Sequence, residues 1–138
     1  MPSENTFCSQ LAELNSRSRW YSTQNWHLPF AYIGVSSVLV GMIADKIPAI
    51  LPWASLFAGI LGIFTLAHMC TIQDGIKRAV SAIQFVESEL KIKQTAQYKA
   101  FVHLFPMMSI VVLGIAAHFI MSWASFSGNI IIQQIAAK

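Results

Sequence analysis

The stretch that decides the fold is IPAILPWASLFAGILGIFTLAHMC, residues 47–70, which contains no Asp, Glu, Lys or Arg. An α-helix rises about 1.5 Å per residue, so a helix of this length crosses the roughly 30 Å hydrocarbon layer of a bilayer. Inside lipid the backbone polar groups must bond within the segment, which a helix achieves. Residues 47–70 are therefore predicted to form a transmembrane helix.

Two further stretches without these charged residues flank this helix, Trp20–Ala44 before it and Ala100–Ala137 after it. Within them, residues 28–44 and 101–126 are long and apolar enough to cross the hydrocarbon layer. The predicted fold class is an all-α integral membrane protein with three transmembrane helices in a single membrane domain.

The connection between the first two spans consists of Asp45, Lys46 and the residues around Pro48. A connection this short permits only a tight antiparallel hairpin. After the third span, residues 127–138 are expected to form a tail on the outer side of the membrane.

The overall composition excludes several classes of protein. Only 11% of the residues are charged and 55% are apolar, which does not suit a soluble or disordered chain. The net charge is +3, but no basic stripe with interleaved aromatic residues suggests a nucleic-acid partner. Cys8 and Cys70 lack the spacing of a redox or zinc motif, and we expect free thiols. The expected partners are the lipid bilayer and other protein subunits.

The basic residues predict which side of the membrane each segment occupies. The amino-terminal segment and the segment between spans two and three share a side, where they hold seven Lys and Arg residues: Arg17, Arg19, Lys77, Arg78, Lys91, Lys93 and Lys99. The other side has only Lys46 and Lys138. By the positive-inside rule, the protein is expected in the cell (inner) membrane with a cytoplasmic amino terminus.

Residues 71–99 are expected to form an amphipathic cytoplasmic helix between spans two and three. Apolar residues recur there at helical spacing and define a candidate interaction face: Ile76, Val80, Ile83, Val86 and Leu90. A shorter amphipathic helix is expected within the amino-terminal segment, residues 1–27, where a weaker stripe includes Phe7, Leu11, Leu14 and Tyr21.

Four histidines are the candidates for cofactor binding. The predicted topology places His27, His68 and His103 near the cytoplasmic ends of their spans, at one depth. Neutral imidazoles on facing helices can ligate haem iron or a transition metal, which leaves haem b or a metal as an alternative to the expected absence of a cofactor. His118 lies about 22 Å further along its helix than His103, and we expect it to hydrogen-bond to a neighbouring helix.

Glu87 is unusual because its helical position lies within the apolar stripe. A carboxylate in that position loses hydration when the stripe is buried, and it needs a basic partner. The candidates for this structural ion pair are Arg17, Arg19 and Lys91. An acid used for proton transfer or effector sensing is the alternative.

Small residues follow two of the spans and permit close contact between helices. They are Gly34, Ser37 and Gly41 in the first span and Ser55, Ala58, Gly59 and Gly62 in the second. Packing within the hairpin and oligomerisation explain these stripes equally well.

The expected function is that of a small non-enzymatic membrane protein, acting as an accessory subunit or as a self-associating module of a complex. The sequence has no GxSxG, HExxH, Walker or GxGxxG motif. One alternative is a haem- or metal-bearing anchor of an electron-transfer complex. In length and span number the chain is similar to the haem-binding anchor subunits of succinate dehydrogenase type, but no motif residue carries over. The other alternative is a channel, a pore-forming lysis protein or an immunity protein.

Overall fold

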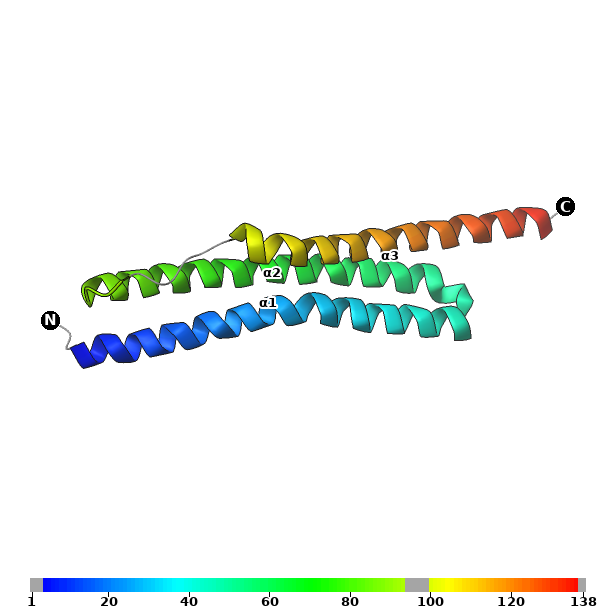
Figure 1. Ribbon diagram of the computed structural model, residues 1–138. Helices are drawn as coiled ribbons and strands as arrows, with labels where there is room; N and C mark the ends of the chain where they lie inside the picture. The colour runs from blue at the N-terminus through cyan, green and yellow to red at the C-terminus, as the bar shows by residue number, and fades with distance from the viewer. Residues whose placement is uncertain (1–3, 94–99, 137–138) are drawn as a thin grey trace. The chain divides into compact units, whose positions relative to one another are not determined.

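Helix α2 continues well beyond the apolar stretch that predicted it. In the computed structural model, which describes residues 4–93 and 100–136, α2 extends from Leu51 to Glu89 (Figure 1). The separate helix expected over 71–99 is instead the second half of α2, as far as Glu89. No proline lies between Cys70 and Glu89, and α2 continues through Gly75, so no residue there ends the helix.

Helix α1 is also one long element, extending from Glu4 to Lys46. The amino-terminal helix and the first span, expected as separate elements, are its two halves. Pro29 lies inside α1 and is buried. A proline removes one backbone hydrogen bond, but membrane helices tolerate it because neighbouring groups satisfy the freed carbonyl.

A short turn joins α1 to α2. It contains the 3-10 helix η1, Pro48–Ile50, in which the Ile50 N–H donates to the Ile47 carbonyl at 3.1 Å. The expected tight hairpin is therefore confirmed.

Helix α3 extends from Ala100 to Ala136 and completes the set of three long helices. All three are long and apolar enough to cross a membrane. Large apolar side chains remain exposed along them, with Phe64 68% exposed and Leu113 69% exposed. Such exposure suits contact with lipid and would be unfavourable in water. The three long apolar helices and their exposed apolar side chains are those of an all-α, multi-pass membrane protein.

The chain divides into two units. Unit 1 comprises Met1–Leu28 and His68–Met107, and unit 2 comprises Pro29–Ala67 and Met108–Lys138. Pro29 lies at this division in α1, and Pro106 lies close to it in α3.

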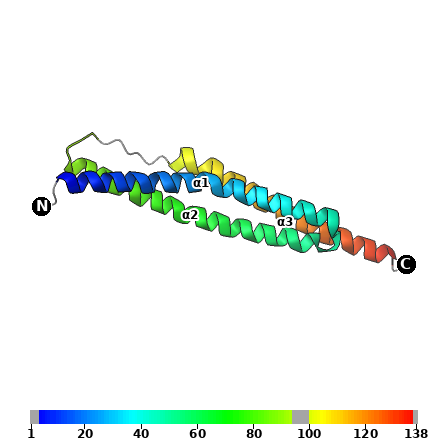
Figure 2. The ribbon, with the colours of Figure 1, turned by 90° about the horizontal axis from the view of Figure 1, so that it is seen from below.

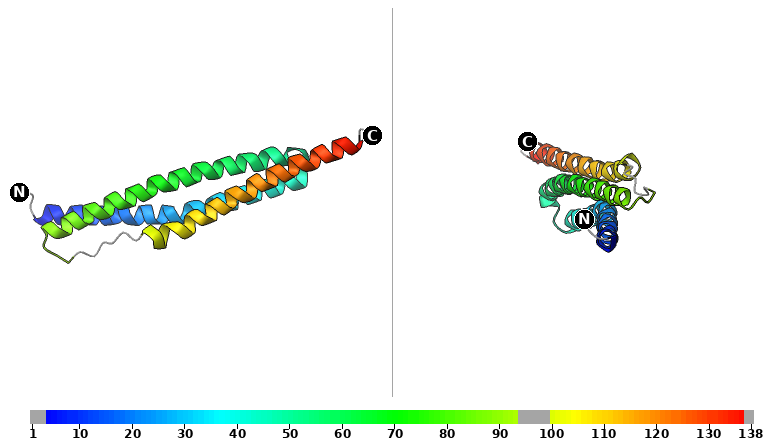
Figure 3. Two further views of the ribbon diagram at one scale, coloured as in Figure 1. Left: turned by 90° about the horizontal axis from the view of Figure 1, so that it is seen from above. Right: turned by 90° about the vertical axis from the view of Figure 1, so that its left-hand side faces the viewer.

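Unit 2 contains parts of three helices. Within it, α1 and α3 have the same chain direction and α2 has the opposite one (Figures 2 and 3). Its buried residues include many polar side chains beside the apolar ones: Tyr32, Ser36, Val40, Ser55, Ala58, Val111, His118 and Ser122.

Unit 1 has a core formed largely by one face of α2. The buried apolar residues of this face are Met69, Ile72, Ala79, Val80, Ile83 and Val86. Three buried polar residues accompany them: Asn25, Gln73 and Glu87.

Candidate functional site

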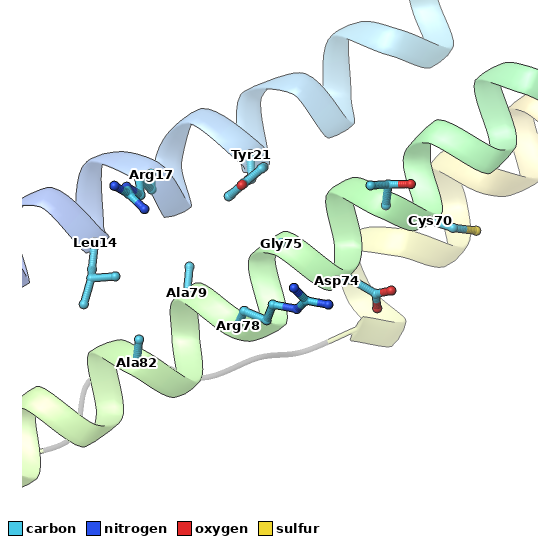
Figure 4. Close-up of a pocket in the computed structure, with 10 residues that line it drawn as sticks. Leu14, Arg17, Tyr21, Cys70, Asp74, Gly75, Arg78, Ala79 and Ala82 are labelled. Atoms are coloured by element: carbon cyan, nitrogen blue, oxygen red, sulfur yellow. The ribbon is translucent and has the colours of Figure 1, made fainter.

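A groove of about 580 Å³ lies between α1 and α2 in unit 1, and we call it the arginine groove (Figure 4). Successive turns of α1 supply Leu14, Arg17 and Tyr21 to one wall. The facing wall belongs to α2 and is formed by Cys70, Thr71, Asp74, Gly75, Arg78, Ala79 and Ala82. Three residues of the α2 wall, Gly75, Ala79 and Ala82, have small side chains or none and leave the groove open.

Gly75 sets the position of the Tyr21 ring. A Cβ atom at Gly75 would lie 2.8 Å from the Tyr21 Cζ atom, closer than van der Waals contact permits. Figure 4 shows the Tyr21 side chain directed from α1 towards α2. Trp20 packs edge-on against the Tyr21 ring, with their centroids 5.1 Å apart. Glycine at this position therefore permits the close approach of a ring that lines the groove.

Two arginines face the arginine groove at the same level. The contact between Tyr21 and Gly75, continued one turn along each antiparallel helix, places Arg17 opposite the turn that carries Arg78. Arg17 pairs with Glu13 on its own helix, and both side chains are more than 60% exposed. Among the ion pairs of the described residues, none includes Arg78.

The acidic group in the arginine groove is Asp74. Its Oδ1 atom lies 3.5 Å from the Lys77 ammonium, so its negative charge is offset by a neighbour. Arg17 is paired with Glu13 and Asp74 with Lys77, so the Arg78 guanidinium gives the groove an excess of positive charge. A groove of this kind can bind anions.

A second polar site lies in unit 2, where His118 of α3 meets Ser36 of α1. The His118 Nε2 atom is 3.0 Å from the Ser36 Oγ atom. The Ser36 hydroxyl also donates to the Ile33 carbonyl of its own helix at 3.3 Å, and the histidine tautomer decides which partner donates in the bond between Ser36 and His118. The expected hydrogen bond from His118 to a neighbouring helix is confirmed.

Other polar atoms of unit 2 are buried with no hydrogen-bond partner. The Nδ1 atom of His118 is buried and has no hydrogen-bond partner among the described residues. The Tyr32 hydroxyl is also buried, with no hydrogen-bond partner in the part of the chain that the structure describes, and the Tyr32 and His118 rings lie edge to face at 6.2 Å. By contrast, the Ser122 hydroxyl donates to the Pro52 carbonyl at 2.8 Å. Unpaired polar atoms inside an apolar environment are costly, so this region is a candidate for function.

An apolar groove of about 550 Å³ lies beside His118, between α1 and α3 of unit 2, and we call it the α1–α3 groove. His118 lines it but is only 7% exposed. Small residues form much of the remaining wall: Ser36, Ser37, Gly41, Ala44, Gly114 and Ala117. Two backbones with so few side-chain atoms between them permit close approach by a third helix or by lipid.

The two small-residue stripes predicted from the sequence have different roles. On α2, a Cβ atom at Gly62 would lie 2.4 Å from the Tyr32 hydroxyl, and one at Gly59 would lie 3.2 Å from the Phe119 ring. The α2 stripe therefore permits packing inside unit 2. On α1, a Cβ atom at Gly34 or Gly41 would meet nothing within 4 Å, so the α1 stripe is open.

The described residues include the side chains of two of the three histidines proposed as cofactor ligands, and a shared haem site stays a prediction. His27 and His68 both belong to unit 1 and are exposed. The side chain of His103 lies outside the described residues. Among the described residues, no group of three His, Cys, Asp or Glu side chains could hold a metal ion.

Glu87 is buried, with 3% of its surface exposed. The antiparallel register places Arg17 and Arg19 two turns or more from the level of Glu87, about 12 Å away along the helix axis for Arg17. Lys91 lies beyond the end of α2, in the left-handed conformation with φ 54°. The pairing of Glu87 with one of these three residues stays a prediction.

The candidate interaction face on α2 is found largely in the core of unit 1. Val80, Ile83 and Val86 are each less than 9% exposed, while Ile76 and Leu90 are partly exposed. These residues pack inside the chain, which leaves less of this face for a partner protein.

Sequence reasoning missed Ser36, Tyr32 and the groove position of Arg78. Tyr32, Ser36 and Val40 recur at four-residue spacing and form the buried face of α1. That spacing can predict the buried face of α1. The stripe of Gly34, Ser37 and Gly41 suggested instead that a different face of the helix is packed. The groove position of Arg78 could not be predicted from the sequence. It depends on the register between α1 and α2, which the pattern of neither helix alone determines.

The chain matches no protein-family model, no curated protein and no solved structure.

Proposed function

We propose that the protein is a non-enzymatic membrane protein that acts through assembly, as an accessory subunit or a self-associating module of a membrane complex. The observation that carries this proposal is the open α1–α3 groove. Its partner would be a transmembrane helix of another subunit or of a second copy of the chain.

The composition of the groove supports a helical partner. Association of helices in lipid depends on close packing and interhelical hydrogen bonds, since lipid tails are as apolar as the side chains. A Cβ atom at Gly41 would meet nothing within 4 Å, so a partner backbone can come near there, and Ala117 adds little bulk to the facing wall. The exposed residue Ser37 supplies a hydroxyl group at the same groove.

The proposed orientation follows from the basic residues. Seven Lys and Arg residues on one side against two on the other favour a cytoplasmic amino terminus in the inner membrane.

The experiment compares two adjacent alanines of α3. Ala117 lines the α1–α3 groove and Ala116 does not, although both are exposed. The full chain, extracted from its native membrane in a mild detergent, is weighed by native mass spectrometry. We expect a mass above that of one chain, and we expect Ala117→Leu to lower it while Ala116→Leu leaves it unchanged.

A parent protein that has the mass of a single chain in the mild detergent would contradict the proposal. Equal loss of assembly in the two variants would show instead that bulk anywhere on α3 disrupts the complex, and would remove the groove from the explanation.

A further inference from the structure

We infer that the arginine groove binds the phosphate headgroup of an anionic phospholipid, held by Arg17 and Arg78 from the two facing helices. The site is separate from the α1–α3 groove, and the inference does not depend on the proposed assembly.

The first argument is the position of the groove along α2. It begins at Cys70, the last residue of the apolar stretch, and ends at Ala82, about 18 Å further along the helix. The headgroup layer of a bilayer is about 5 to 8 Å thick on each side. The inner end of the groove therefore opens where lipid phosphates lie, and long arginine side chains can reach back towards that layer.

The second argument is charge. Arg78 takes part in none of the ion pairs among the described residues, and the partner of Arg17 is an exposed carboxylate on the same helix. Exposed pairs of that kind contribute only about 0 to 1 kcal/mol, so a phosphate can replace Glu13 at little cost. A guanidinium group offers paired N–H donors that match two phosphate oxygens.

The third argument concerns the groups one turn away from the two arginines. Tyr21 lines the groove one turn from Arg17, and its hydroxyl is a further donor for a phosphate oxygen. The missing side chain at Gly75 leaves room for this ring, since a Cβ atom there would lie 2.8 Å from the Tyr21 Cζ atom. Trp20 and Tyr21 are residue types that favour the membrane interface, where a lipid headgroup would be met.

A lipid explains the site better than free phosphate does. The wall near Cys70 and Thr71 continues directly into the apolar span, which gives the acyl chains a surface to follow. Basic pockets between transmembrane helices are a known type of site for anionic lipid headgroups.

The experiment measures lipid binding to the full chain in detergent by native mass spectrometry. Phosphatidylglycerol and phosphatidylcholine are added in equal amounts, and the bound lipid is identified by its mass. We expect preferential retention of phosphatidylglycerol. The double variant Arg17→Gln/Arg78→Gln should lose about tenfold in affinity for it, as expected when charge-assisted bonds are removed.

The matched control is Arg19→Gln/Lys93→Gln, which removes the same charge from two exposed residues outside the groove. It should retain the preference for phosphatidylglycerol. Arg78→Lys keeps the charge and loses the paired donors, so an intermediate affinity is expected, and this conservative variant guards against misfolding of the double variant.

Three results would overturn the inference. One is a parent protein that binds the two lipids equally. Another is an equal loss in both double variants, which would indicate general surface attraction. The third is full displacement of phosphatidylglycerol by millimolar inorganic phosphate, which would assign the site to free phosphate.

Discussion

At the scale of single residues, the bond between His118 and Ser36 is the clearest link between α1 and α3. Its 3.0 Å length and full burial predict a measurable coupling. Hydrogen bonds between membrane helices contribute about 0.6 kcal/mol on average and up to about 1.7 kcal/mol. In a double-mutant cycle of Ser36→Ala and His118→Phe, we expect a coupling free energy in that range, measured from unfolding in detergent.

Val38→Ala with His118→Phe is the control for this cycle, because Val38 lies on the same helix and is 63% exposed. That pair should show additive effects. Additivity in the Ser36 cycle as well would mean that the hydrogen bond adds nothing to stability.

At the scale of elements, the carboxyl end of α2 has a recognisable cap. The Lys91 N–H donates to the Ser88 carbonyl, and the Ile92 N–H donates to the Glu87 carbonyl, both at 3.1 Å. This pair of bonds is a Schellman motif, whose left-handed position usually holds glycine. Lysine occupies that position here, with φ 54°.

Lys91→Gly should therefore stabilise the protein by about 1 kcal/mol, since glycine adopts the left-handed region without steric cost. The measurement is the free energy of unfolding in a denaturant titration. Lys93→Gly removes the same charge at a position without a positive φ, and it should give no gain. A gain from both substitutions would attribute the effect to charge instead.

The elements also show which features the sequence could predict. The three apolar stretches predicted the spans, because length and hydropathy decide membrane crossing locally. The ends of the helices were harder to predict, since a change from apolar to amphipathic pattern after Cys70 suggested a break. Proline is the residue that breaks a helix most strongly, and none occurs between Cys70 and Glu89.

The candidate sites depend on pairs of helices, which explains why they were only partly predicted. Glu87 was correctly placed on the buried face, because burial follows the periodicity of its own helix. Arg17 and Arg78 line one groove because of the register between α1 and α2 that the Tyr21–Gly75 contact shows. Such an arrangement depends on two helices together, and it cannot be predicted from the apolar periodicity of α1 or of α2 alone.

At the scale of the whole molecule, the three spans predict that the α1–α2 turn and residues 71–93 lie on opposite sides of the membrane. The test uses a chain in which Cys8 and Cys70 are replaced by serine, with one cysteine introduced at Ser88 or at Ile47. In right-side-out vesicles, an impermeant maleimide should label position 47, while position 88 should react only after the membrane is opened.

Labelling of position 88 in sealed vesicles, with position 47 protected, would reverse the orientation. Equal labelling of both positions before opening would instead contradict the crossing of α2.

The turn between α1 and α2 has a consequence for the biogenesis of the protein. The charged groups near this turn are Asp45 and Lys46, whose side chains form an ion pair at 3.0 Å. If the first two spans enter the bilayer together as a helical hairpin, the segment translocated to the far side carries a pair of opposite charges and no net charge. An isolated charge at the centre of a bilayer costs about 2.5 to 3.5 kcal/mol, and a neighbouring opposite charge lowers that cost. Translocation of the hairpin during insertion therefore moves one ion pair, and no net charge, across the membrane.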